Sequence, residues 1–213
     1  MPANICVGRN FPPTFFSMIN KELFTDIAKH YGHYASWAVW VNEGQNPKSN
    51  IGELSIFNIE TNPLLLDTIK TNIIMVGLNI SRPIEFTFGN FHDKRSQSQD
   101  FKIRYAFKDT IAWGAYMTDI IKGFEHLISG TVASYLKKNQ EFELKNIDLF
   151  KRELKHIQAV NPILIAIGND SFNILDRYFN KEFQLIKVPH YSMHISKENY
   201  RKKIEELLKN IKL

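Results

Sequence analysis

Three polar segments of the chain supply side chains that can bind a ligand or exchange a proton. Asn79, Asp119 and the pair His190 and Ser192 each stand at or just beyond the end of a short apolar run. Ligands of open parallel sheets bind outside the carboxyl ends of the strands, so these side chains would meet there if the runs are parallel strands. Each residue alone is more simply a turn or cap residue, but three such segments together favour a binding site.

The elements that would position these residues alternate between apolar strands and amphipathic helices. The strand signals lie at residues 73–77, 115–117 with 120–121, 163–167 and 183–188, and the helix signals at 147–157, 172–179 and from about Ser196 onward. Such alternation implies parallel pairing through right-handed crossovers. We therefore expect an α/β fold, with one three-layer α/β/α domain over residues 1–213 and a short, mostly parallel, four-stranded sheet.

The first 62 residues form an extension before this alternating pattern. Apolar residues recur every four positions from Phe15 to Ile27 and predict a helix that stops near Gly32. The other elements predicted here are a β-prone segment at 34–41, an extended segment at 51–57, and a brief helix from Asn62-Pro63 through Lys70. We expect residues 1–62 to pack on the domain, where they cover a sheet edge, recognise a partner or lengthen a DNA-binding face.

Composition narrows the class of protein. The formal net charge of +5 and the pI near 9.1 suit a phosphate-bearing partner without requiring one. The 16 Phe, eight Tyr and three Trp fit bulky core packing, and they also fit stacking platforms for bases. Cys6 is the only cysteine, which fits a reducing cytosol. With no signal-peptide pattern and no apolar run near about 20 residues, we expect a cytoplasmic protein without membrane association.

Common cofactor motifs do not occur in the sequence. There is no Walker loop, no Gly-x-Gly-x-x-Gly and no Cys-x-x-Cys. His190 and His194 stand four apart, as two zinc ligands on a helix would, but the neighbouring proline, tyrosine and serine favour a loop. We therefore expect no cofactor and no metal.

Four segments resemble, in their order and spacing, the uracil-DNA glycosylase superfamily. Residues 76–79, Val-Gly-Leu-Asn, resemble its first motif, and His190-Tyr191-Ser192 resembles its second, commonly His-Pro-Ser. Between them, residues 115–119 resemble the strand end that carries the base-reading Asn, and residues 154–168 resemble the third strand with its preceding helix. The resemblance covers about residues 72–212. It implies an α/β fold and an enzyme that flips a base out of the DNA stack.

The resemblance assigns roles to individual residues. Asn79 would orient water toward the anomeric carbon of the sugar, and His190 would donate a hydrogen bond to the base oxygen as charge develops on it. Phe88 and Phe91 are candidates to stack on the flipped base, with core packing as the alternative. Ser192 would contact a phosphate of the bent strand.

Gly77 and Leu78 would lie against the base, and Ser81 would contact a phosphate, but the motifs depart from the family pattern. Ile80-Ser81 replaces the usual Pro-Gly or Pro-Tyr, and Tyr191 replaces proline. Asp119 replaces the base-reading Asn, and an ionised carboxylate only accepts hydrogen bonds. It would suit a base with extra N–H groups rather than uracil, unless Asp119 is instead a helix N-cap.

Residues 92–108 form a basic segment after the first motif. It carries Lys94, Arg95 and three further basic residues against two aspartates. We interpret it as an inserted polar loop, which either contacts DNA phosphates through Lys94 and Arg95 or is simply solvated.

These observations lead to one function and two alternatives. The leading hypothesis is a DNA glycosylase-like hydrolase that cleaves the N-glycosidic bond of a flipped uracil or other modified or deaminated base, with DNA as its partner. The first alternative is an inactive member of the fold that binds nucleic acid, a nucleotide or a protein. The second is a small-molecule-binding α/β domain whose resemblance is convergent.

Overall fold

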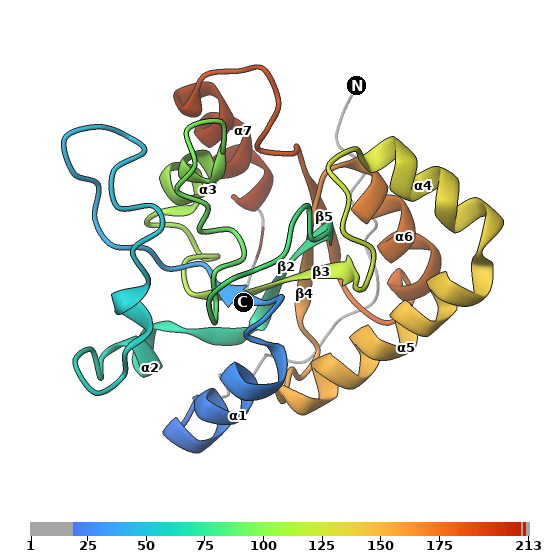
Figure 1. Cartoon of the computed structure of the whole chain (residues 1–213), viewed down its shortest axis with the longest axis horizontal. Helices are drawn as coiled ribbons and strands as arrows, with labels where there is room; N and C mark the ends of the chain where they lie inside the picture. Colours follow the sequence, from blue (N-terminus) through green and yellow to red (C-terminus); the bar gives the residue numbers. More distant parts are fainter. Residues whose placement is uncertain (1–18, 210, 212–213) are drawn as a thin grey trace.

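The computed structural model describes residues 19–209 and residue 211 (Figure 1). Phe15, the first apolar position of the predicted N-terminal helix, and Cys6 lie outside the described residues. That helix, α1, runs over Lys21–Tyr31, and the Asn20 side chain caps it by accepting from the Leu23 amide (2.8 Å). Gly32 is its C-cap, so the helix stops near Gly32, as predicted.

The central sheet has five strands in the order β1-β3-β2-β4-β5. Their bounds are β1 Ser36–Trp37, β2 Lys70–Asn79, β3 Ala115–Ile121, β4 Ile163–Ile167 and β5 Leu185–Val188. The last four pair in parallel, as predicted, while β1 pairs antiparallel with β3. The expected count of four strands is therefore wrong, because the aromatic segment of the extension adds two residues to the sheet edge beside β3.

Seven α-helices surround the sheet in the described part of the chain. Besides α1, they are α2 Leu65–Thr68, α3 Asp100–Phe107, α4 Ser129–Lys138, α5 Gln140–His156, α6 Asn169–Phe179 and α7 Lys197–Leu208. Figure 1 shows α3 and α7 on one side of the sheet and α4, α5 and α6 on the other. None of the helices in the described ranges is long and apolar enough to cross a membrane.

Alternation along the strands divides the core into two layers. Ile74 and Val76 of β2 pack with α1, α4, α5 and α6, whereas Ile73 and Met75 pack with α3 and α7. This arrangement is possible because successive strand side chains point to opposite faces. It explains why β2 and β4 are continuous apolar runs, since both of their faces are covered.

Three predicted segments differ in the structure. Residues 51–57 are not extended; they form turns and a 3-10 helix at Leu54–Phe57. The brief helix after Asn62-Pro63 spans only Leu65–Thr68, because the longer strand β2 already begins at Lys70. Residues 92–108 are not simply a polar loop, because their second half forms helix α3.

Candidate functional site

The carboxyl ends of β2 and β3 bring Gly77 and Asp119 side by side. The two residues are register partners in the parallel pair. A Cβ atom at position 77 would overlap Asp119 Oδ1, so the carboxyl group lies across the neighbouring strand only because residue 77 is glycine. Phe91 closes the same space, since its Cζ atom would lie 3.3 Å from that Cβ position. Asp119 belongs to β3, so the helix N-cap interpretation is wrong.

Asn90 holds the Asp119 carboxyl group. Its Nδ2 donates to Asp119 Oδ2 (2.8 Å) and to the Tyr34 carbonyl (2.8 Å). Asp119 is only 3% exposed, and this burial raises its pKa to about 7. The Asn90 hydrogen bond and the Lys122 charge act in the opposite direction and lower the pKa, but burial has the larger effect. Near neutral pH the group therefore exchanges a proton. In its protonated form it both donates and accepts, as the amide of asparagine does.

The segment that carries Phe88 and Phe91 is held in a costly backbone conformation. Both residues have positive φ angles, 61° and 63°, which are unfavourable for bulky side chains. Ser36 Oγ donates to the Phe88 carbonyl (2.8 Å), and Trp40 Nε1 donates to the Phe91 carbonyl (3.3 Å). The extension thus fixes the shape of the loop that presents Asn90 and Phe91 to Asp119.

The loop after β5 brings His190 toward the same edge of the sheet. Ser192 donates its backbone amide to His190 Nδ1 (3.2 Å), so the neutral imidazole carries its proton on Nε2, where it can donate. The surrounding protein desolvates the ring and lowers the pKa of His190, although the residue keeps solvent access. The ring stacks on Tyr191 with centroids 4.3 Å apart and packs against Gly168, where a Cβ atom would lie 3.4 Å away.

Tyr191 and Asp100 join the site without having been predicted to do so. Burial, followed by the charges of Asp100 and Asp119, raises the pKa of Tyr191 well above its ordinary value. Burial also raises the pKa of Asp100, which is 5% exposed, to about 6. Asn90 was likewise missed. No local pattern marks Asn90 or Asp100, and Tyr191 stands in the sequence only as the residue that replaces proline between His190 and Ser192.

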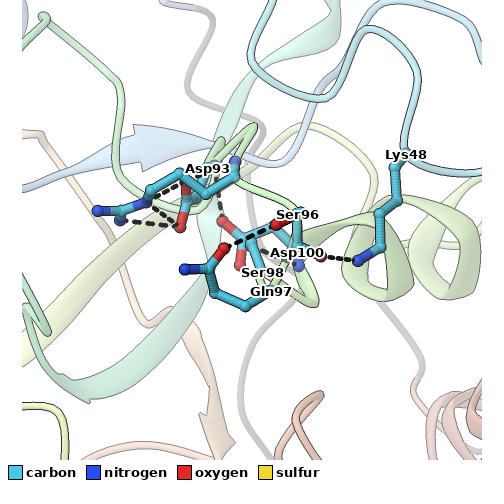
Figure 2. A network of polar contacts seen from close by, with 7 residues as sticks. Lys48, Asp93, Ser96, Gln97, Ser98 and Asp100 are labelled. Atoms are coloured by element: carbon cyan, nitrogen blue, oxygen red, sulfur yellow. Dashed lines mark hydrogen bonds and ion pairs between the residues drawn. The ribbon is translucent and has the colours of Figure 1, made fainter.

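Asp100 organises the loop before α3. The Asp100 carboxylate accepts from the backbone amide of Asp93 (2.8 Å), and the backbone amide of Asp100 donates to the Ser98 hydroxyl (3.2 Å). Figure 2 shows this network together with Lys48, whose ammonium group donates to the Ser96 carbonyl. The loop is therefore ordered by internal hydrogen bonds.

The basic residues of this region divide into two groups. Lys102 and Arg104 are buried, and their charged ends donate to backbone carbonyls of Met193, Val41 and Pro47. Lys94 and Arg95 are exposed, although Arg95 pairs with Asp93 (2.8 Å). Of the predicted phosphate contacts, Lys94 and Arg95 are thus on the surface, as are Ser81 and Ser192.

The remaining predicted residues contact groups other than the Asp119 carboxyl group. The two N–H groups of Asn79 Nδ2 are shared among the carbonyl oxygens of Ile80, Phe124 and His126 at 2.9–3.0 Å, so only the side-chain oxygen is left to orient a water. Leu78 packs on the opposite face of β2 from Gly77. Phe88 is 2% exposed and packs on Phe24 (5.4 Å between ring centroids), which matches its core interpretation.

A buried ion pair lies behind the site. Lys122, directly after β3, pairs with Glu153 of α5, and Tyr116 Oη donates to the other oxygen of the same carboxylate (2.8 Å). Lys122 also lies over the Tyr34 ring, with its ammonium group 5.0 Å from the ring centroid. All four groups have partners, so this cluster acts as a structural support for the end of β3.

Comparison of the chain with protein-family models, curated proteins and solved structures gives no match.

Proposed function

We propose that the chain hydrolyses the N-glycosidic bond of a nucleobase that is flipped out of DNA into the carboxyl edge of β2 and β3. The observation that carries the proposal is the buried Asp119 carboxyl group, held by Asn90 beside Gly77 with a pKa near 7. A buried group with such a pKa at the end of parallel strands is typical of a site that binds and protonates ligands.

Asp119 supplies the base-reading function in this proposal. When protonated, it offers one donor and one acceptor, the pattern that an asparagine presents to the O4 and N3–H of uracil. When ionised, it only accepts, and a base with additional N–H groups is then preferred. The choice of base therefore depends on pH, with uracil-type bases favoured below about pH 7, the pKa of the group.

His190 and Asn79 supply the chemistry. Water adds its oxygen to C1′ of the sugar while the C–N bond breaks, and the base leaves with the bonding electrons and then takes up a proton. The Nε2–H of neutral His190 donates to the base oxygen on which negative charge develops. The Asn79 side-chain oxygen accepts from the attacking water.

The second candidate function is base binding without hydrolysis. Its support is the Asn79 amide, which is committed to three backbone carbonyls and resembles a structural brace more than a water-positioning group. The Asp119 carboxyl group would still recognise a base in this case.

A base-excision assay separates the two functions. Single- and double-stranded oligonucleotides that carry uracil, hypoxanthine, xanthine or a mismatch are incubated with the protein below and above pH 7, and abasic sites are measured. We expect excision that falls strongly in His190→Ala, and persists in the matched control His194→Ala from the same exposed loop. In the Asp119→Asn variant, the rate of uracil excision should not fall as the pH rises through 7. Binding without excision in every substrate would refute hydrolysis and favour the second function.

A further inference from the structure

Three side chains of metal-binding type meet where α1 lies against the end of α5. They are Asp26 and His30 of α1 and His156, the last residue of α5. Figure 1 shows α1 beside this end of α5. None of the three residues belongs to the Asp119 site.

The arrangement follows from helix geometry and helix packing. Asp26 and His30 are four residues apart on α1, so their side chains share one face. Asp26 Oδ1 lies 3.1 Å from His30 Nδ1, and Asp26 Oδ2 lies 2.5 Å from His156 Nε2. One ligand atom from each residue lies within 4.8 Å of the other two.

Tyr31 orients the third ligand. Its hydroxyl oxygen lies 2.7 Å from His156 Nδ1. It can accept from an Nδ1–H of His156, which leaves the Nε2 lone pair facing Asp26. Metal-binding histidines generally make such a bond through their other ring nitrogen.

We propose that Asp26, His30 and His156 bind one Zn²⁺ ion. Two imidazoles and one carboxylate are ligands that zinc prefers, whereas magnesium and calcium prefer oxygen ligands alone. Tetrahedral zinc with bonds of about 2.0–2.1 Å spaces its ligand atoms about 3.3 Å apart. The Asp26 and His156 atoms therefore separate by less than about 1 Å when the ion enters.

Solvent access allows the ion to enter and a water to complete its coordination. The side chains of Asp26, His30 and His156 are 42%, 47% and 37% exposed. The bound ion would link α1 directly to α5. Because the ligands come from the extension and from the main α/β unit, zinc would hold the extension in place.

The test is a zinc titration of tag-free, full-length protein after chelator treatment and desalting, followed by calorimetry. We expect one Zn²⁺ per chain, with affinity at least tenfold weaker in Asp26→Asn, His30→Gln and His156→Gln. Tyr31→Phe should weaken zinc binding about tenfold or more, which is the typical effect of losing the hydrogen bond to the other ring nitrogen of a metal-binding histidine. The matched control is His33→Gln, an exposed histidine just beyond α1 that is not in the cluster, and it should bind as the wild type does.

His30→Gln is the decisive variant, because the polar contacts of His30 are with Asp26 of its own helix and do not join α1 to α5. Its far-UV circular dichroism without metal should match that of the wild type, and its own metal-free melting temperature is the reference for zinc, because the His30 ring also packs on the His156 ring (5.2 Å between centroids). Zinc should raise the melting temperature of the wild type and of His33→Gln, but not of His30→Gln. Unchanged zinc affinity in His30→Gln, or no saturable binding in the wild type, would overturn the proposal.

Discussion

Replacement of Asp119 by asparagine should change how stability depends on pH. The pKa of Asp119 is about 7 in the folded chain, above its ordinary value of 3.8, because the group is buried. Above pH 3.8 the unfolded chain therefore binds fewer protons at this position than the folded chain does. The free energy that Asp119 contributes is fully present below that value and is lost as the pH rises through about 7. An asparagine does not titrate, so the variant lacks this loss.

The magnitude follows from the size of the pKa shift. A shift of about 3 pH units at about 1.4 kcal/mol per unit amounts to roughly 4 kcal/mol. The side-chain oxygen of an asparagine at position 119 can still accept from Asn90 Nδ2, so this hydrogen bond is retained in the variant. Between about pH 4 and about pH 8, the stability of Asp119→Asn relative to the wild type should rise by roughly that amount.

Urea unfolding of both proteins across this pH range, followed by far-UV circular dichroism, measures the difference. The contributions of other titrating groups, such as Asp100, are present in both proteins and largely cancel. A constant difference between the two stability curves would refute the reasoning, because Asp119 would then titrate as a solvated carboxyl group.

Two further substitutions test the supports of the site. Gly77→Ala should cost about 1–3 kcal/mol of unfolding free energy, because the new Cβ overlaps Asp119. The matched control Gly130→Ala meets no atom within 4 Å and should leave the urea midpoint unchanged or higher; equal effects would contradict the overlap. Lys122→Met should cost about 3–5 kcal/mol, because it leaves Glu153 charged and buried, and the double variant with Glu153→Gln should recover most of that loss in the same assay. No recovery would mean that packing of the Lys122 side chain, not its charge, supports β3.

The main strands could be predicted because the apolar residues that are buried in them are neighbours in the sequence. Ile163–Ile167 is a continuous apolar run, which is typical of a strand that is covered on both faces, and it forms β4. Helix α3 could not be predicted in the same way. Its buried positions include Lys102 and Arg104, whose charged ends are satisfied by carbonyls far away in the sequence. Periodicity of apolar residues does not detect a helix buried by such contacts.

The sequence predicts candidate site residues at the strand ends but not in the loops between the strands. Asp119 and His190 come directly from the rule that ligands bind outside the carboxyl ends of parallel strands. Phe88 and Phe91 are equivalent in the sequence, but the structure places one ring in the core and the other beside Gly77. Phe88 and Phe91 both have positive φ angles, and hydrogen bonds from the extension hold the carbonyl groups of both residues.

The extension is therefore part of the site rather than an addition to the domain. The Tyr34 carbonyl accepts from the same Asn90 amide that holds Asp119, and Ser36 fixes the carbonyl of Phe88 two residues earlier. Tyr34 and Ser36 follow shortly after α1, so the contacts of Asn90 and Phe88 with the extension are made close to the end of that helix. A zinc ion bound at His156 would act on this same chain of contacts. The α1–α5 junction and the Asp119 carboxyl group are thus connected through backbone segments that the extension provides.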